Sequence, residues 1–455
     1  MKKILLVQAI SMEGIDIERV YPIGIVTLGS IIHASGRYAL DIYDMNMGVD
    51  PYGGLREKLE SFDPDIIGIS LRNVDPLGNR TTSLIVPFAI TLSFIRRFKP
   101  DVPLLAGGTA FSLFPERLMR QFPEIDLGIV GEAEHSILPV LDGIDNPPKV
   151  PGLIYREGDA IHLIPPKPDF DMAHYTMPNR DLLDPVEYLK VNKYVESIGV
   201  ETKRGCVYNC GYCSYPLLSG CGMRCREPKD VVDEIEFLHK EYGVTRIHLT
   251  DSIVNFPVNH LDDICREIIR RRLDIHWSGF FRENLFTKEN APLYRDSGCE
   301  CFSLSPDGLS QRALDIMEKH LTVEEILNTA KILSDVGITT VYHFLVNTPG
   351  ETWQTVDEGK ALIDKIYNIH ENSKSIGTIV LNLIRIMPRT KVEKLALENG
   401  VITPETDLLY PTYYNPDPFK TVRYDLEIYH NKRNIFMWQD ATTGASLEAE
   451  RHSER

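Results

Sequence analysis

The sequence has little of what marks membrane proteins, nucleic-acid-binding proteins and small disulfide-rich proteins. Its longest apolar run, LIVPFAITLSFI, is too short to span a bilayer and is typical of a core helix. Acidic residues outnumber basic ones, and the formal net charge of −16 argues against duplex nucleic acid or an anionic membrane as the main partner. The chain has 8 cysteines among 455 residues, clustered at one place, which indicates a metal site in a reducing cytosol better than a disulfide framework.

The N-terminus, MKKILLVQAISMEG, carries two lysines followed by an apolar segment, as a secretory signal peptide does. The segment is too short for that role, and Glu13 and Asp16 follow it, so we expect a buried first strand instead. The chain is 43% hydrophobic and shows no internal repeat of fixed period, and its length predicts two or three globular domains.

The first third alternates short apolar segments with helical patterns. The expected strands are KILLVQAI, ALDIYDMN, DIIGISL, VPLLAGG and IDLGIVGEAE. Fully apolar strands of this kind are typical of a parallel sheet covered on both faces. We therefore predict an α/β fold that begins with a Rossmann-like doubly wound domain over residues 1–145.

Several expected strands end in small residues, where ligands bind in such sheets. Gly107, Gly108 and Gly131 would let a ligand approach the backbone closely. The alternative is that these glycines only make tight turns, and the residues alone do not decide between the two.

The rest of the chain divides into three parts. Residues 146–190 are proline-rich and predict a linker that contains a small hairpin. Residues 191–400 show six strand patterns, each followed by a helix, which predicts a partial (β/α)6 TIM-like barrel, since eight strands are needed to close one. Residues 401–455 predict a C-terminal cover over the barrel mouth and a disordered tail.

The stretch KRGCVYNCGYCSYP places Cys206, Cys210 and Cys213 in a C-x3-C-x2-C run at the end of the first barrel strand. A closed metal site needs four ligands, so three leave an open position. Thiolates select zinc, copper(I) or an iron–sulfur cluster, and a [4Fe–4S] cluster held at three corners leaves one iron for an amine and a carboxylate. The alternative is a zinc site that recruits Cys221 or Cys225 as its fourth ligand.

This constellation resembles the radical S-adenosylmethionine (SAM) superfamily, whose signature is C-x3-C-x-aromatic-C, with Tyr212 at the aromatic position. The N-terminal third is similar to the cobalamin (B12)-binding domain fused to one branch of that superfamily. The resemblance implies an enzyme that transfers an electron from the cluster to SAM. The 5'-deoxyadenosyl radical so formed removes hydrogen from an unactivated carbon.

The resemblance also implies roles for residues near the barrel strand ends. Tyr212 would lie by the adenine, Arg282 would bind the SAM carboxylate, and further contacts to SAM would come from Asp251, Ser252, Ser305 and Asp307. Many relatives have Glu-Ser-Gly where this chain has SPDG, so Ser305 or Asp307 would replace the contact of that glutamate. Candidates to meet the substrate are Tyr215, Glu283, His343 and Asn347.

For cobalamin, the resemblance implies that Ser70, Gly107, Gly108 and Gly131 approach the corrinoid. The Asp-x-His-x-x-Gly motif that gives a histidine to cobalt is absent, as it often is in this branch. The alternative is a domain that kept the fold but binds no cobalamin.

Three functions remain open. The first is cobalamin-dependent C-methylation of a small molecule, and the second is a cobalamin-independent rearrangement, dehydration or deoxygenation, for example of an aminosugar. The third is a zinc-binding or electron-transfer protein. For either radical enzyme we expect an electron donor as partner, whether flavodoxin, ferredoxin or a reductase, with neither nucleic acid nor membrane, and a cytoplasmic location.

Overall fold

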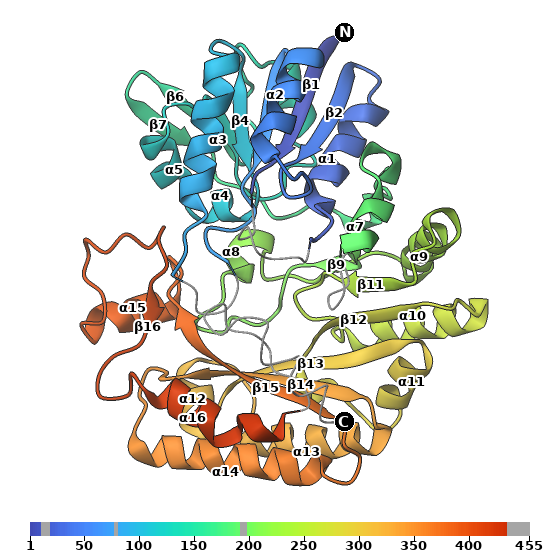
Figure 1. Ribbon diagram of the computed structural model, residues 1–455, viewed down its shortest axis with the longest axis vertical. Coiled ribbons are helices and arrows are strands. Elements are labelled where there is room, and N and C mark those ends of the chain that lie inside the picture. The colour runs from blue at the N-terminus through green and yellow to red at the C-terminus, as the bar shows by residue number, and fades with distance from the viewer. Residues whose placement is uncertain (11–18, 77–80, 192–197, 435–455) are drawn as a thin grey trace.

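The computed structural model describes residues 1–10, 19–76, 81–191 and 198–434, which form two α/β domains (Figure 1). The tail expected to be disordered lies outside the described residues. Among the described helices, none is long and apolar enough to cross a membrane.

The N-terminal domain contains a parallel sheet with helices on both faces, as predicted. Its strands follow the order β2-β1-β3-β4-β5, and the reversal between β1 and β3 is the place where doubly wound folds bind ligands. The strands are β1 (Lys2–Gln8), β2 (Tyr38–Asp44), β3 (Ile66–Ser70), β4 (Leu104–Gly107) and β5 (Leu127–Ile129). The main helices are α1 (Ile23–Ala34), α2 (Pro51–Ser61), α3 (Ile85–Phe98), α5 (Pro115–Gln121) and α6 (Ile137–Asp142).

The hairpin expected in the linker is part of this sheet. Strand β6 (Leu153–Glu157) pairs antiparallel with β5, and β7 (Ala160–Leu163) pairs with β6. The sheet therefore has seven strands and continues past residue 145. After it come two short 3-10 turns and α7 (Pro185–Val191).

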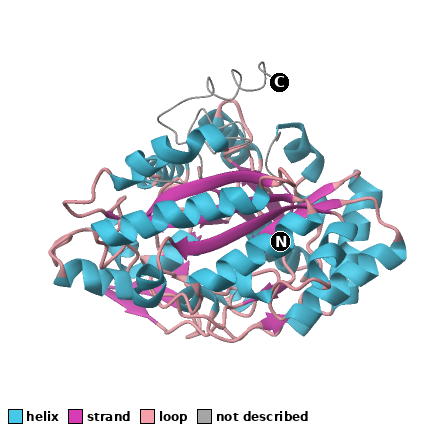
Figure 2. Ribbon diagram, turned by 90° about the horizontal axis from the view of Figure 1, so that it is seen from below, coloured by secondary structure: helices cyan, strands magenta, loops and turns pink. Residues whose placement is uncertain are grey.

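The second domain is the expected incomplete barrel. Six parallel strands run in chain order, and a short antiparallel strand, β16 (Tyr413–Tyr414), closes one edge. The parallel strands are β8 (Ile198–Val200), β11 (Arg246–Leu249), β12 (His276–Phe281), β13 (Cys299–Gly308), β14 (Thr339–Val346) and β15 (Ile376–Arg385). Helices lie beside the strands (Figure 2). Those of the barrel, labelled in Figure 1, include α9 (Pro228–Tyr242), α10 (Val258–Arg271), α11 (Asn290–Asp296), α13 (Val323–Val336) and α14 (Trp353–His370).

The C-terminal part lies at two places on the barrel. Helix α16 (Val422–His430) packs against β15 and α14, so it lies along the side of the barrel. Asn415 and Pro416 lie nearer the strand ends, where the side-chain amide of Asn347 donates hydrogen bonds to both, at 2.6 and 3.0 Å. These contacts fix Asn347, a predicted substrate contact, in the wall beyond β14.

A buried charge cluster joins the segment after the hairpin to the barrel. Glu234 on α9 accepts from Arg180 at 2.6 Å and from Arg226 at 2.7 Å, and all three side chains are buried. The guanidinium of Arg180 also lies over the ring of Tyr21 from the N-terminal domain, 4.9 Å from its centroid. Because buried charges are stable only when paired, Glu234 holds both arginines in place.

Replacing Glu234 by glutamine should therefore lower the free energy of unfolding by about 3–5 kcal/mol, because two buried guanidinium groups lose their counter-charge. Urea unfolding followed by tryptophan fluorescence measures this. The matched control is Glu241→Gln, an exposed position on the same helix, which should change stability by less than about 0.5 kcal/mol. Equal effects of the two variants would contradict the role given to Glu234.

Candidate active site

The three clustered cysteines lie on one loop, residues 205–223, which we call the cysteine loop. It connects β9 (Lys203–Arg204) to β10 (Arg224–Cys225), and these two short strands pair antiparallel after β8. Gly205 begins the loop with φ +91°, and a Cβ atom there would stand 2.0 Å from the carbonyl oxygen of Gly222. Only glycine fits, so the loop starts at a fixed angle.

Asp251 and Ser252, after β11, hold the start of this loop. The Asp251 carboxylate accepts from the backbone N–H groups of Thr202 and Lys203 at 2.9 and 3.1 Å, and from the Thr202 hydroxyl at 2.6 Å. It also pairs with the Lys203 ammonium at 3.0 Å. The Ser252 hydroxyl donates to the carbonyl oxygen of Gly205 at 2.6 Å. Both residues thus position the loop, and their contact with SAM stays a prediction.

The middle of the cysteine loop is fixed from the opposite side. The N–H of Gly211 donates to the carbonyl oxygen of Met317 at 2.7 Å, and its own carbonyl accepts from Val392 at 2.9 Å. A Cβ atom at Gly211 would approach the Cβ of Lys391 to 3.2 Å. The segments that follow β13 and β15 therefore hold the middle of the cysteine loop.

The burial and the pKa of the three cysteine thiols bear on whether they can bind a cluster. Cys206 is buried, while Cys210 and Cys213 are partly exposed. Burial raises the pKa of Cys213 to about 12, and the nearby Cys210 and Cys206 thiols contribute to that rise. Three thiolates placed this close repel one another, and a bound cation relieves that repulsion.

The described residues contain no group of three or more His, Cys, Asp or Glu side chains that could hold a single metal ion. Ligands of a zinc ion must converge on one point, whereas the cysteines of a [4Fe–4S] cluster bind separate iron atoms. Three cysteines on one short loop can each bind a separate iron atom of such a cluster. Cys221 is exposed, and the zinc alternative gains no support from its position.

Tyr212 is oriented by two residues across the barrel mouth. Its hydroxyl donates to Asp307 at the end of β13, and the same carboxylate oxygen accepts from Lys319 at 2.5 Å. Asp307 takes a left-handed backbone conformation, with φ +65°, beside an irregularity in the pairing of β13 with β14. The Tyr212 ring is thus held in place, and its contact with the adenine of SAM stays a prediction. Lys319 lies beside Tyr212 and Asp307, although the sequence did not mark it.

Arg282 follows β12 and is almost fully buried. Its guanidinium lies 3.7 Å from the ring centroid of Tyr208 in the cysteine loop. Its Nη2 donates to the carbonyl oxygens of Lys319 and His320 at 2.8 and 2.6 Å. Arg282 therefore supports the loop and the turn that carries Lys319, and its binding of the SAM carboxylate stays a prediction.

Glu283 is fully buried, and neither carboxylate oxygen has a hydrogen-bond partner among the described residues. Burial raises the pKa of this carboxyl to about 7, although the nearby charges of Lys319 and Arg282 limit the rise. A carboxyl with this pKa exchanges its proton near neutral pH, as general acids and bases do.

His343 lies on the concave face of the barrel sheet. Its ring contacts that of Phe280 at 6.1 Å between centroids, although β13 separates their two strands. The Phe280 ring in turn contacts His248 on β11 at 5.8 Å. Phe280 is 44% exposed, so this face borders open space. Burial lowers the pKa of His343 to about 4, which keeps its imidazole neutral at pH 7.

The predicted corrinoid contacts gather at the carboxyl ends of the strands in the N-terminal sheet, which we call the corrinoid edge. Ser70 and Gly107 end two adjacent strands, and their neighbours Gly108 and Gly131 follow β4 and β5. At Gly108, with φ +100°, a Cβ atom would stand 2.6 Å from the carbonyl oxygen of Leu71. Packing alone requires glycine at position 108, while a Cβ atom at Gly107 would have its nearest neighbour at an ordinary 3.5 Å.

Ser305, a predicted SAM contact, lies on β13 in the barrel and is partly exposed. Its contact with SAM stays a prediction.

The two sets of strand ends face each other across the domain boundary. Helix α8 (Tyr215–Ser219), which Tyr215 begins, lies between the domains and contacts α4 (Thr109–Leu113) (Figure 1). Asp75, beyond β3, pairs with Arg385 at the end of β15 at 2.8 Å, and both side chains are nearly buried. The cysteine loop and the corrinoid edge therefore border the same region.

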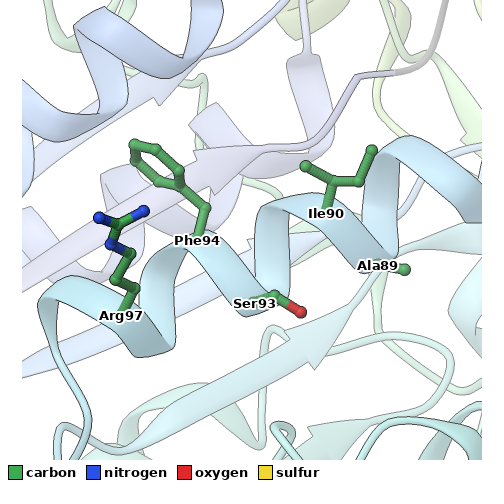
Figure 3. Close-up of a pocket in the computed structure, with 5 residues that line it drawn as sticks. All are labelled: Ala89, Ile90, Ser93, Phe94 and Arg97. Carbon is green, nitrogen blue, oxygen red and sulfur yellow. The ribbon is translucent and has the colours of Figure 1, made fainter.

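A surface hollow of about 400 Å³ lies elsewhere, on α3 (Figure 3). Its lining residues are Ala89, Ile90, Ser93, Phe94 and Arg97. None of the candidate site residues lines it, so this hollow is separate from the candidate active site.

Two family models match the chain. Residues 200–363 match the radical SAM superfamily, and residues 18–140 match the B12 binding domain. The chain therefore contains a radical SAM domain that is preceded by a B12-binding domain. The cysteine spacing and Tyr212 predict the radical SAM domain, and the match confirms it.

Relatives of this chain include an uncharacterized methyltransferase of Pyrococcus horikoshii. It is 26% identical over 340 residues, which cover 74% of this chain and 71% of the relative. An anaerobic magnesium-protoporphyrin IX monomethyl ester cyclase of Rubrivivax gelatinosus is 27% identical over 313 residues, 67% of this chain but only 55% of the cyclase. The radical SAM methyltransferase TsrM of Kitasatospora setae, solved with cobalamin and a [4Fe–4S] cluster, has the same fold, with a TM-score of 0.75. It is 24% identical and aligns over 89% of this chain and 80% of its own.

Glu283→Gln should stabilise the radical SAM enzyme, and more so at higher pH. The folded state holds the Glu283 proton up to about pH 7. The unfolded chain releases it near pH 4.5, so the wild-type protein loses stability as pH rises between these values. The gain should grow by about 2 kcal/mol from pH 5.5 to 8.5, as measured by urea unfolding. Glu289→Gln, an exposed neighbour, is the control and should show no such growth.

Proposed function

We propose that the chain is a cobalamin-dependent radical SAM enzyme that methylates a carbon atom of a small molecule. The observation that carries this proposal is the opposition of the two strand-end edges, with Asp75 and Arg385 paired between them. A methyl group can pass from a corrinoid to a substrate carbon only if both edges border one reaction space. Methyltransferases among the relatives support the proposal.

The residues present fit the cofactors that this reaction needs. Cys206, Cys210 and Cys213 would bind three iron atoms, and the Tyr212 ring, held by Asp307, would lie against the adenine of SAM. When bound, these cofactors supply an electron, a hydrogen-abstracting radical and a methyl group. An external donor, such as a flavodoxin, a ferredoxin or a partner reductase, would supply the electrons in a cytoplasmic setting.

The chain itself positions the reactants and limits charge. The anchored cysteine loop would fix where SAM binds, because its start and its middle are hydrogen-bonded to the barrel. On the concave face, Phe280 offers an apolar ring beside the neutral imidazole of His343, whose Nε2 lies 3.4 Å from the Ser303 hydroxyl. Glu283 can hold or release a proton near pH 7. Tyr215, at the start of α8 and 43% exposed, would meet the substrate from between the domains.

A cobalamin-independent rearrangement, dehydration or deoxygenation is the second candidate. It is favoured by Gly108, whose presence the packing against Leu71 explains without a corrinoid. The two candidates differ in what the protein binds. Hydroxocobalamin, added to the reconstituted protein and followed by gel filtration, should remain bound if methylation is the function. Loss of all cobalamin under those conditions would favour the second candidate.

The product test uses the anaerobically reconstituted protein with SAM, dithionite and hydroxocobalamin. We expect both 5'-deoxyadenosine and S-adenosylhomocysteine by mass spectrometry. The second product reports loss of a methyl group from SAM. Detection of 5'-deoxyadenosine alone would overturn methylation but leave radical chemistry in place.

Replacing Cys206, Cys210 or Cys213 by alanine should abolish SAM cleavage and reduce bound iron at least tenfold, because a cluster held at two corners is lost. Iron analysis and 5'-deoxyadenosine formation measure the two effects. Cys221→Ala is the matched control, since that thiol is exposed on the same loop, and it should keep both iron and cleavage. Iron retained after all three single substitutions would contradict the assignment.

A further inference from the structure

Two arginines stand at the two ends of the cysteine loop. Arg204 ends β9 and Arg224 begins β10, and they are directly opposite in the antiparallel pair. Because these two residues flank the loop that carries the cysteines, contacts that hold them also hold both ends of the loop.

Both arginines are held by glutamates of the other domain. Glu132 accepts from Arg224 through both oxygens, at 2.9 and 2.7 Å, and Glu134 pairs with Arg204 at 2.6 Å. Glu132 also accepts from the backbone N–H of Phe170 at 2.9 Å, while the Arg204 guanidinium lies over the Phe170 ring, 5.3 Å from its centroid. Bidentate pairs of this kind fix direction as well as distance.

The cluster is nearly buried, with side-chain exposures of 8% for Glu132, 7% for Glu134 and 12% for Arg204. Glu132 also lies 3.8 Å from Arg204, and Glu201, next to β8, adds a third carboxylate on Arg204 at 2.7 Å. Separating such pairs leaves buried charges without partners, which costs several kcal/mol. The paired strands β9 and β10 therefore move together with Glu132 and Glu134.

Glu132 directly follows Gly131, which comes after β5 at the predicted corrinoid edge and within the region matching the B12 binding domain. Gly131, a predicted corrinoid contact, and Glu132, which binds Arg224 at the end of the cysteine loop, are thus adjacent in the chain. We propose that Glu132 and Glu134 are positioning residues that couple corrinoid binding in the N-terminal domain to the placement of the cysteine loop, and hence to SAM binding. This inference rests on the proposed function.

The test measures coupling in full-length protein reconstituted with iron and sulfide. Calorimetric titration gives the SAM affinity with and without hydroxocobalamin, and hydrogen–deuterium exchange follows peptides from residues 205–223. For the wild type we expect hydroxocobalamin to tighten SAM binding at least fivefold and to slow exchange in the cysteine loop. In Glu132→Gln, hydroxocobalamin should still bind within threefold of wild type, but its effect on SAM affinity should fall below twofold.

The matched control is Asp407→Asn. Asp407 pairs with Arg117 at 2.7 Å, also between the domains but away from the cysteine loop. This variant should keep the wild-type coupling. If it lost coupling as Glu132→Gln does, general domain docking would explain the effect and the inference would be wrong.

Glu134→Gln, which removes only the Arg204 contact, provides a second variant should Glu132→Gln fail to fold, and its coupling should be reduced. Wild-type protein that binds both hydroxocobalamin and SAM without mutual effect would overturn the inference and leave the proposed function intact. Protein that binds no hydroxocobalamin would instead overturn the proposed function.

Discussion

The structure depends on keeping three thiols near one another at the barrel mouth. Thiolates repel, and burial raises the pKa of Cys213, so the loop would not hold this arrangement by itself. It is held because Gly205 accepts the Ser252 hydroxyl bond at one end and Gly211 is hydrogen-bonded to Met317 in the middle. Anchoring of this kind is what lets a cluster bind at three corners and keep the fourth open, since ligands that are already in place lose little freedom on binding.

Ion pairs between the two domains fix how the cysteine loop faces the N-terminal sheet. A purely apolar contact would hold the domains together without fixing one direction, whereas a carboxylate–guanidinium pair fixes both distance and angle. Asp75 with Arg385 and Glu132 with Arg224 both connect the N-terminal domain to the barrel domain. Their low exposure makes each pair costly to break, so the two edges keep their separation.

Much of this can be read from the sequence, and the rest cannot, for physical reasons. Apolar runs that alternate with helical patterns predict both sheets, because those patterns are local, and cysteine spacing predicts the site. The hairpin of β6 and β7 reads as part of a linker because prolines flank it, and its pairing with β5 depends on distant residues. Lys319 cannot be found either, because its partner Asp307 is 12 residues away in a different element. The IVGEAE stretch is visible as a strand end, but the arginine partners of its glutamates, Arg204 and Arg224, lie far along the chain in the other domain.

Charge balance around Lys319 links Glu283 to the orientation of Tyr212. Lys319 is near two carboxyl groups, but only Asp307 is within hydrogen-bonding distance. If Glu283 were ionised, a second negative charge would compete for the same ammonium in a buried region. Because burial raises the pKa of Glu283 to about 7, it stays largely neutral below that pH and leaves Lys319 to Asp307. Asp307 can then accept from the Tyr212 hydroxyl at the same time. A buried carboxyl without hydrogen bonds thus preserves the bonds of its neighbours.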